Sequence, residues 1–297
     1  MSFSRICLIG FGEVGQILAE DLIKAGVKDI SAYDVLFKIA DSAPSAAAKK
    51  LGVRATVSAV KAAMGAELIL CAVTAASDLD AARSVTGGMG ANVFFVDMNS
   101  ASPGVKQLAS QIVDAAGGRY VEAAVMTPIH PLRIASPTLL GGPHAQAFLQ
   151  RARPLGFNVT VASDHVGRAS ATKMCRSVII KGLESLLTES MISARHYGVE
   201  KEVLASLSDM LPIPDWEKLA RYMISRSLEH GQRRAEEMRE VAKTVQEAGL
   251  DPLMSAACAA RQDWSARHKG ALSESELGAM LDALLRDINA EGAQRVR

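Results

Sequence analysis

Three glycines near the start of the chain have a spacing that suits phosphate binding. Gly10, Gly12 and Gly15 follow a short apolar run, and a helical pattern covers residues 14–25. In a Gly-x-Gly-x-x-Gly turn, the first glycine permits the tight turn, the second lets the backbone approach a pyrophosphate, and the third lets the helix pack on the strand. The N–H groups and the dipole at the helix start can hold phosphates. The predicted dinucleotide-binding loop comprises Gly10, Phe11, Gly12, Glu13, Val14 and Gly15.

An acidic residue closes the next apolar run and could bind a ribose. Asp34 lies 19 positions after Gly15. A carboxylate at this place can accept hydrogen bonds from both ribose hydroxyls of an adenosine and would repel a 2′-phosphate. The sequence therefore predicts NAD as the cofactor, while Lys38, which could reach a phosphate, keeps NADP open. The alternative is a solvated aspartate at a strand end.

Small and polar residues follow two later strand patterns. Val73 and Thr74 end one of them, and a loop there could lie along the cofactor. Asn99 and Ser100 follow the next one, and we expect them to face the nicotinamide and the substrate. The structural alternative is that Ser100 or Ser102 caps the helix that begins at the following proline.

A lysine and a serine four residues apart lie early in a long helical pattern. Lys173 and Ser177 therefore project from one face of that helix, with small residues one turn before them. In an interdomain cleft, such a lysine could serve as a general acid or base if its pKa falls from about 10.4, its value in solution. Burial and a positive nicotinamide ring would both lower that pKa. An ordinary surface lysine is the alternative.

A loop stiffened by prolines follows the strand pattern over residues 120–125. It contains His130 and Arg133, and an arginine there could bind a substrate carboxylate or phosphate. A solvated loop charge is the alternative. The histidines and the four cysteines form no metal-ligand spacing, so no metal site is expected.

The order of the elements predicts an α/β fold in two domains. Residues 1–165 alternate strand and helix patterns, which is typical of a Rossmann-type, doubly wound parallel sheet covered on both faces. Residues 166–297 contain only helical patterns, and a helix over about 166–197 begins this all-α domain. A capping-box form, Ser273 to Glu276, predicts the start of the last helix. The strand patterns cover residues 6–10, 30–34, 67–73, 93–97, 120–125, 138–142 and 158–161.

Composition excludes several classes of partner. Among 297 residues, Lys plus Arg number 33 and Asp plus Glu 32, and aromatic residues make up 4%. This balance gives no reason to expect binding to nucleic acid or to an acidic membrane. No run has the form of a signal peptide or a membrane span, and the cysteines lie far apart, so we expect a reduced, cytoplasmic protein.

The order of motifs in this chain resembles that of the β-hydroxyacid dehydrogenase family, which includes 3-hydroxyisobutyrate and 6-phosphogluconate dehydrogenases. The resemblance covers nearly the whole chain. Family members carry a catalytic lysine in a Gly-x5-Lys-x3-Asn pattern, and Gly167 and Lys173 match it. The resemblance implies reversible hydride transfer between a β-hydroxyacid and NAD(P), and a homodimer in which the helical domains interlock.

Two departures from the family pattern concern the substrate. Ser177 stands where the family has asparagine, and residues 122–128 replace the family's D-A-P-V-S-G-G motif by E-A-A-V-M-T-P. Met126 takes the place of the serine, and methionine cannot bind an anion. We therefore expect the substrate to be bound differently. The run over residues 173–182 resembles a less characterised, phosphogluconate-dehydrogenase-like, NAD-binding branch.

The sequence thus predicts an NAD(P)-dependent oxidoreductase that acts on the CH–OH group of a small, hydroxyacid-like substrate. Lys173 would move the hydroxyl proton, Ser177 and Asn99 would orient the reacting oxygen, and His130 or Arg133 could grip an anionic tail. Two alternatives stay open. One is an imine or pyrroline-carboxylate reductase, which shares this architecture, and the other is a catalytically silent NAD(P)-binding protein.

Overall fold

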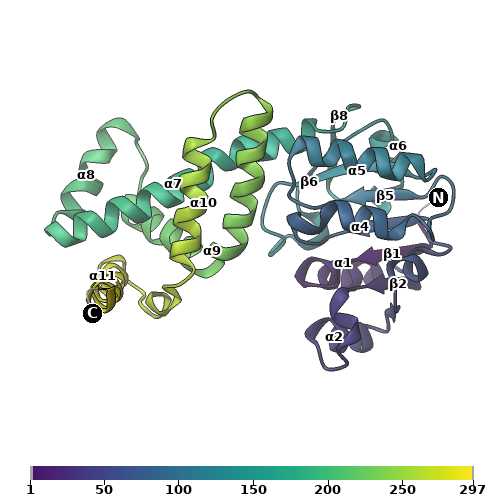
Figure 1. Cartoon of the computed structure of the whole chain (residues 1–297), viewed down its shortest axis with the longest axis horizontal. Coiled ribbons are helices and arrows are strands. Elements are labelled where there is room, and N and C mark those ends of the chain that lie inside the picture. Colours follow the sequence, from purple (N-terminus) through teal and green to yellow (C-terminus); the bar gives the residue numbers. More distant parts are fainter. Residues whose placement is uncertain (1–2, 296–297) are drawn as a thin grey trace. The chain divides into compact units, whose positions relative to one another are not determined.

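The computed structural model describes residues 3–295 and divides into two units, Met1–Met174 and Cys175–Arg297. The first unit is built on one eight-stranded sheet (Figure 1). Its strands are β1 (Arg5–Ile9), β2 (Asp29–Tyr33), β3 (Arg54–Ala55), β4 (Leu68–Cys71), β5 (Phe94–Asp97), β6 (Arg119–Val125), β7 (Thr138–Gly141) and β8 (Val159–Ser163). The predicted α/β class is correct. Sequence patterns missed the short β3.

Strand order in the sheet is β3-β2-β1-β4-β5-β6-β7-β8. The first six strands are parallel, but β7 runs antiparallel to β6, and β8 is parallel to β7. The expectation of a fully parallel sheet is therefore wrong at this edge. The segment between β6 and β7 holds only the short helix η3 (Arg133–Ala135), so the chain turns back beside β6 instead of crossing over.

Six α-helices cover the two faces of this sheet. They are α1 (Glu13–Lys24), α2 (Ala43–Leu51), α3 (Ala59–Ala63), α4 (Asp78–Val85), α5 (Pro103–Ala115) and α6 (Ala145–Ala152). Helices α1, α2 and α6 contribute to one buried apolar cluster, and α3, α4 and α5 contribute to the other. Burial on both faces explains why the central strands are apolar along their length.

The order of the strands reverses between β1 and β4, which are neighbours in the sheet although β2 and β3 separate them in the chain. In such sheets, ligands bind beyond the carboxyl ends of the strands at this reversal. The loops after β1, β4 and β5 therefore form the region in which a site is expected.

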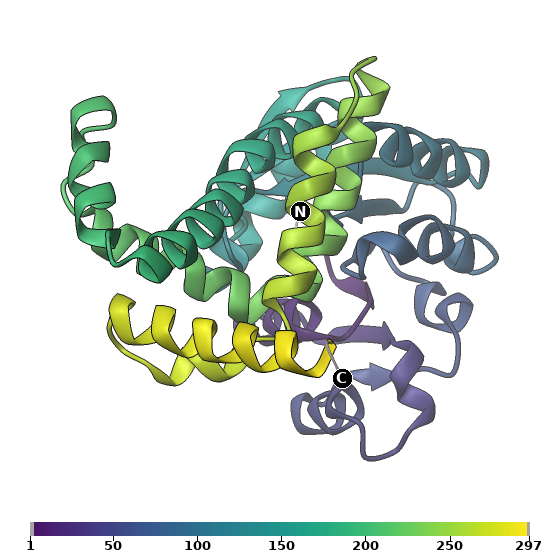
Figure 2. The ribbon, with the colours of Figure 1, turned by 60° about the vertical axis from the view of Figure 1, so that its left-hand side comes forward.

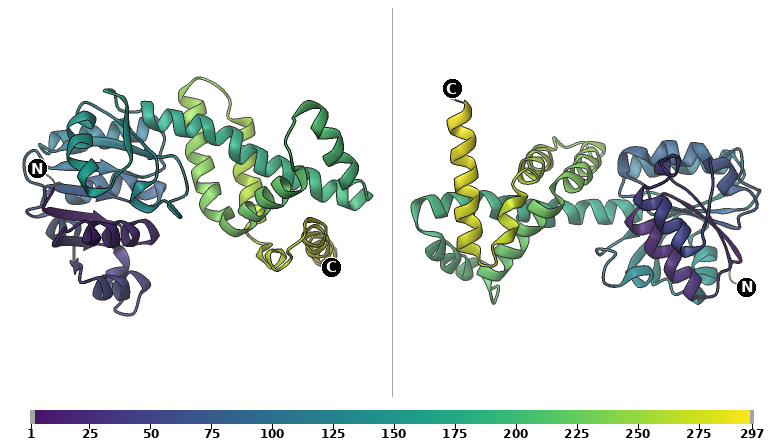
Figure 3. Two further views of the ribbon diagram at one scale, coloured as in Figure 1. Left: turned by 180° about the vertical axis from the view of Figure 1, so that it is seen from behind. Right: turned by 90° about the horizontal axis from the view of Figure 1, so that it is seen from below.

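The second unit is helical throughout its described residues (Figures 2 and 3). Helix α7 (Arg168–Tyr197) begins in the first unit and continues into the second. The others are α8 (Glu200–Met210), α9 (Trp216–Glu247), α10 (Leu253–Ser265) and α11 (Leu277–Arg295). No helix in the described part of the chain has both the length and the apolar character needed to span a membrane.

A buried polar contact links three helices of the second unit. The Arg234 guanidinium of α9 and the Gln262 amide of α10 both donate hydrogen bonds to Glu184 of α7. Burial raises the pKa of Glu184, and Arg234 opposes that rise. Around this contact, α9 and α10 approach closely, since a Cβ at Gly231 would lie 2.4 Å from the Gln262 carbonyl oxygen.

The predicted capping box at the last helix is wrong. Helix α11 begins at Leu277, three residues later than the box requires. Ser273 belongs to the 3-10 helix η5 (Lys269–Ser273), and its hydroxyl donates to the carbonyl oxygen of Gly270. The hydroxyl is therefore used inside the preceding turn and does not cap α11.

Candidate active site

The glycine loop joins β1 to α1 and is held by close backbone contacts. Gly10 has a φ of +89°, and a Cβ there would lie 2.2 Å from the Ala72 carbonyl oxygen. A Cβ at Gly15 would lie 2.2 Å from the Gly10 carbonyl oxygen. Neither position has room for a side chain, in agreement with the turn and packing roles predicted for these two glycines.

Gly12 differs from the other two glycines because its surroundings are open. It is the N-cap of α1 with a φ of −72°. Within residues 3–295, no heavy atom beyond its chain neighbours lies within 4 Å of the place of a Cβ. Among the described residues, no side chain caps the start of α1, where Glu13 and Val14 follow. The backbone donors and the positive end of the helix dipole are therefore available to an anion. A pyrophosphate fits this donor set.

Asp34 supports the glycine loop from the end of β2. Its Oδ2 accepts a hydrogen bond from the N–H of Phe11 (2.7 Å), and its Oδ1 accepts one from the N–H of Leu36 (2.9 Å). The Phe11 side chain is fully buried against Phe37, so this residue shapes the loop from inside. Each Asp34 oxygen keeps a lone pair for a ribose hydroxyl.

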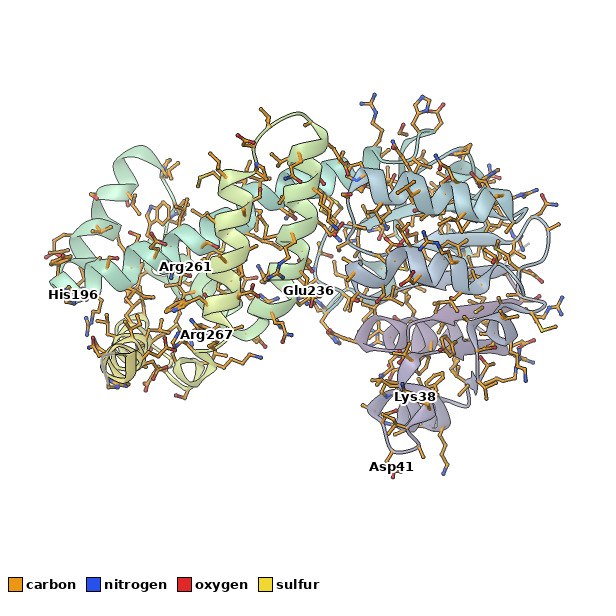
Figure 4. All side chains as sticks on the ribbon, in the orientation of Figure 1. Lys38, Asp41, His196, Glu236, Arg261 and Arg267 are labelled. Carbon is orange, nitrogen blue, oxygen red and sulfur yellow. The ribbon has the colours of Figure 1, made fainter. Side chains whose placement is uncertain are left out.

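The residues after Asp34 form an exposed turn. The 3-10 helix η1 (Val35–Lys38) begins directly after the aspartate, whose side chain caps it. Lys38 is exposed at the end of this turn (Figure 4). Lys38, whose ammonium leaves NADP as an alternative cofactor, therefore lies on a surface turn that follows Asp34 in the chain.

Asn99 joins the loops that follow β4 and β5. Its Oδ1 accepts from the N–H of Val73 (2.7 Å), and its Nδ2 donates to Oδ1 of Asp78 (3.1 Å). The side chain is 4% exposed. Both ends of the amide are thus held by protein groups, which fixes the loop at Val73 and the adjoining Thr74. The substrate contact expected for Asn99 stays a prediction.

A buried charge cluster under this loop was not found from the sequence. Lys106 Nζ lies 2.5 Å from Asp97 Oδ1 and 3.4 Å from Asp78 Oδ2, and all three side chains are at most 1% exposed. The Tyr120 hydroxyl donates to Asp97 (2.7 Å). Burial raises the pKa of Asp78 to about 7, although Lys106 opposes this rise. Burial alone would lower the pKa of Lys106, but the two carboxylates raise it.

Lys173 lies beside Ser100. The Lys173 ammonium donates a hydrogen bond to Ser100 Oγ over 2.7 Å, and both side chains are partly buried. Capping of α5 falls to Ser102, whose hydroxyl accepts from the N–H of Val105 (3.4 Å). Ser100 is thus left for the contact with Lys173. The structure therefore brings together two of the residues that the sequence indicated, from segments far apart in the chain.

Ser177 lies in the second unit, one turn after Lys173 along α7. It is buried, and its Oγ accepts a hydrogen bond from Lys181 (3.3 Å). Lys181 also pairs with Glu237 at 2.7 Å. The hydroxyl therefore has a partner within its own unit, and its role toward the reacting oxygen stays a prediction.

The loop between β6 and β7 is attached to α1. The Arg133 guanidinium pairs with Asp21 (2.9 Å) and Glu20 (2.7 Å). These two carboxylates fix Arg133 to α1, and the contact with an anionic substrate expected for Arg133 stays a prediction. His130 Nε2 lies 3.4 Å from a carboxylate oxygen of Glu13 in the first turn of α1.

Met126 continues the pairing of the two strands, because its N–H donates to the Pro137 carbonyl oxygen (2.9 Å). Its thioether gives the loop no strong donor. Nowhere in residues 3–295 do three or more His, Cys, Asp or Glu side chains gather in a way that could hold a metal ion.

Two family models match parts of the chain. Residues 5–99 match the model described as NADP oxidoreductase, coenzyme F420-dependent, and residues 194–265 match a domain of unknown function, DUF1932. The first match covers the glycine loop, Asp34 and Asn99. The second lies within the helical unit.

Solved structures similar to this chain extend the match over nearly its full length. A conserved hypothetical protein from Sinorhizobium meliloti 1021 is 33% identical, with a TM-score of 0.75, and the match covers 95% of this chain and 96% of that one. A conserved protein of unknown function, described as structurally similar to 3-hydroxyacid dehydrogenases, is 30% identical, with a TM-score of 0.70 over 90% and 99% of the two chains.

A Mycobacterium tuberculosis 3-hydroxyisobutyrate dehydrogenase, solved with L-serine, shares the fold. Its TM-score is 0.71, with 16% identity over 96% of this chain and 99% of that one. The two-domain fold, the glycine loop and the relatives that are at least 30% identical agree. The chain belongs to the β-hydroxyacid dehydrogenase family of NAD(P)-dependent oxidoreductases.

Proposed function

We propose that this protein is a dehydrogenase that moves a hydride between nicotinamide and the CH–OH carbon of a small, hydroxyacid-like substrate, with Lys173 as general acid and base. The contact between Lys173 and Ser100 at 2.7 Å carries this proposal. It places an amine beside a hydroxyl on the loop beyond β5, next to the reversal of strand order where family folds bind their ligands.

The cofactor would be held by the open end of α1 and by Asp34. Backbone N–H groups of Glu13 and Val14 suit a pyrophosphate, and the Asp34 carboxylate suits a ribose. A nicotinamide bound there would accept or supply the hydride. Because the Asp34 charge would repel a 2′-phosphate, we propose that NAD is preferred.

The proton would move through Lys173. As neutral amine, Lys173 can take the proton of a substrate hydroxyl, and as ammonium it can return that proton to a carbonyl oxygen. Ser100 orients the amine by accepting its hydrogen bond. Asn99 is proposed to help orient the substrate from the same loop, and Ser177 from the next turn of α7.

The substrate is proposed to bind without the contacts to its anionic group that the family motif supplies. Met126 and the two residues after it offer neither the serine nor the glycines of that motif. His130 stays a candidate for binding an acidic tail. It is mostly exposed, and its partner Glu13 is exposed as well, so its ring could turn toward a ligand.

We also propose that the protein is a cytoplasmic homodimer joined through its helical unit. Two apolar side chains of α7, Ile179 and Leu186, are 71% and 57% exposed. They are seven residues apart and so share one face of the helix, which a second copy could cover. Light scattering after gel filtration should then give twice the mass of 31.4 kDa. A mass of one chain at all concentrations would contradict the dimer.

The central experiment measures turnover on a panel of hydroxyacids with NAD and NADP. Lys173→Ala should lower kcat about 10²- to 10⁴-fold while NADH still binds with unchanged affinity. Lys49→Ala, a change at an exposed lysine of α2, is the matched control and should leave kcat unchanged. Full turnover by Lys173→Ala would refute the catalytic role.

Adding alcohols, ketones and cyclic imines to this panel separates the alternatives. Cyclic imines reduced faster than any hydroxyacid is oxidised would favour an imine or pyrroline-carboxylate reductase. NADH binding with no turnover on alcohols, ketones or imines would favour a catalytically silent protein. Asp34→Ala should weaken binding of NADH about tenfold more than that of NADPH, and an unchanged ratio would contradict the proposed preference.

A further inference from the structure

Glu122 is a buried carboxylate that the proposed reaction does not use. It lies in the middle of β6, is 0% exposed, and stands at the first position of the altered family motif. Its Oε2 accepts a hydrogen bond from the N–H of Gly167 (2.8 Å), and its Oε1 accepts one from the N–H of Ser170 (2.6 Å). Both oxygens are therefore engaged by the start of α7.

These two N–H groups are the donors that a helix leaves without partners at its first turn. The carbonyl oxygen of Gly167 already accepts from the N–H of Ala171 (2.9 Å), which makes Gly167 the cap residue of α7. A side chain from another element, 45 residues away in sequence, thus closes the helix start. Its negative charge also faces the positive end of the helix dipole.

Lys173 lies one turn beyond Ser170 on the same helix. The path from β6 to the amine therefore runs through Glu122, the first turn of α7 and Lys173, and it ends at Ser100. We infer that Glu122 is a positioning residue for Lys173: by fixing the first turn of α7 to β6, it holds the amine at the Ser100 hydroxyl. This inference rests on the proposed role of Lys173.

The opposite strand leaves room for the carboxylate because it carries a glycine at the paired position. Gly141 of β7 pairs with Glu122 across the antiparallel ladder. A Cβ at Gly141 would lie 2.3 Å from Glu122 Oε2. The absence of a side chain at this position therefore creates the space in which the carboxylate reaches α7.

Hydrogen exchange and chemical labelling test this inference on the full chain without any substrate. In Glu122→Gln, amides of residues 167–173 should exchange about tenfold faster. Glutamine has one acceptor oxygen and no negative charge, so it cannot accept hydrogen bonds from both N–H groups as the carboxylate does. Acetic anhydride should label Lys173 about threefold faster, and the midpoint of its labelling curve should move down by about half a pH unit. Glu122→Asp should recover part of each effect.

Gly141→Ala provides a second variant, since it displaces the carboxylate without removing it, and it should change both readouts in the same direction. Glu67→Gln is the matched control, because it removes a carboxylate that Ser4 and Arg151 hold beside the start of β4. It should leave both readouts unchanged. Glu122 also interacts electrostatically with a buried group of titratable side chains. These are Lys106, Asp97, Asp78 and Tyr120, and none of them is changed in the variants of this experiment.

Unchanged exchange and labelling in a folded Glu122→Gln protein, with NADH bound at one site per chain, would overturn the inference. A loss of NADH binding together with fast exchange across the whole first unit would also overturn it, because Glu122 would then support the fold in general. Absence of turnover on every substrate would defeat the proposed function alone, since neither readout depends on turnover.

Discussion

Helices α1 and α7 have contrasting N-terminal ends. The first turn of α1 has no side-chain cap from residues 3–295 and borders the open space beside Gly12. The start of α7 is closed by the buried Glu122 carboxylate. Both ends carry the same partial positive charge. At the uncapped start of α1, the backbone N–H groups can bind a ligand. At the start of α7, the Glu122 carboxylate occupies these groups, so they cannot bind a ligand, but the residues that follow are held in a fixed position.

The largest expected effect comes from closing the open end of α1. Gly12 has a φ that other residues adopt and free space at its Cβ, so Gly12→Asp should fold and cap the helix. Its carboxylate would then occupy the donors meant for phosphate. We expect NADH to bind on the order of 100-fold more weakly, about 2.7 kcal/mol, without a lower Tm.

Gly12→Ala is the control for this change, because it adds a Cβ without a charge and should cost less affinity. Fluorescence titration with NADH measures both variants. Equal affinity of Gly12→Asp and the unchanged protein would show that the end of α1 does not bind the cofactor.

A smaller effect, on the pH dependence of stability, is expected at the start of α4, where a buried carboxylate is only partly hydrogen-bonded. Asp78 is buried in the first turn, and its Oδ2, 3.4 Å from Lys106 Nζ, accepts no hydrogen bond from the part of the chain that the structure describes. Its folded pKa of about 7 lies above the usual value of 3.8, so its contribution to stability is complete below about pH 4 and is lost as the pH rises through 7. Asp78→Asn removes this dependence.

Between pH 5 and pH 8, the free energy of unfolding of Asp78→Asn should therefore rise relative to the unchanged protein by about 1–3 kcal/mol. Urea unfolding at the two pH values measures this difference. Asp80→Asn, at an exposed carboxylate of the same helix, should show no such trend. A difference that is constant with pH would rule out titration of Asp78 in this range.

The smallest expected effect concerns the loop between β6 and β7, which Arg133 attaches to α1 by ion pairs. Arg133 has a φ of +56° and pairs with two carboxylates of α1. Arg133→Ala should lower the free energy of unfolding by about 1 kcal/mol, and Arg133→Gly should recover about half of this loss because glycine adopts a positive φ freely. NADH affinity should stay unchanged in both. A marked loss of affinity would show that the loop also sets the open end of α1.

Local patterns in the sequence were sufficient for much of the fold and for part of the site. Glycine spacing identified the turn after β1, since Gly10 and Gly15 are required by contacts within a few residues or with the adjacent strand. Helical periodicity found α7 to within two residues of its start. Lys173 was found by its spacing from Gly167 and by family resemblance.

Contacts between distant segments could not be read in the same way. Glu122 and Ser170 are 48 residues apart, and Arg133 and Asp21 are 112 apart. No periodicity links such pairs, because their meeting depends on the register of β6 and on the reversal at β7. The bounds of helices α2 and α3 are hard to predict from the sequence for another reason. Both helices are rich in alanine and short, so their apolar period spans too few turns to stand out.

The pairing of Glu122 with Gly141 makes these two positions depend on each other. A Cβ at position 141 would lie 2.3 Å from the carboxylate oxygen, so a larger residue there requires the acid at position 122 to move, to be shortened or to be lost. The effects of substitutions at the two positions should therefore be non-additive. In libraries that randomise β7 to alter the substrate, position 141 has to be varied jointly with position 122, because a substitution at position 141 alone also displaces the carboxylate that caps α7.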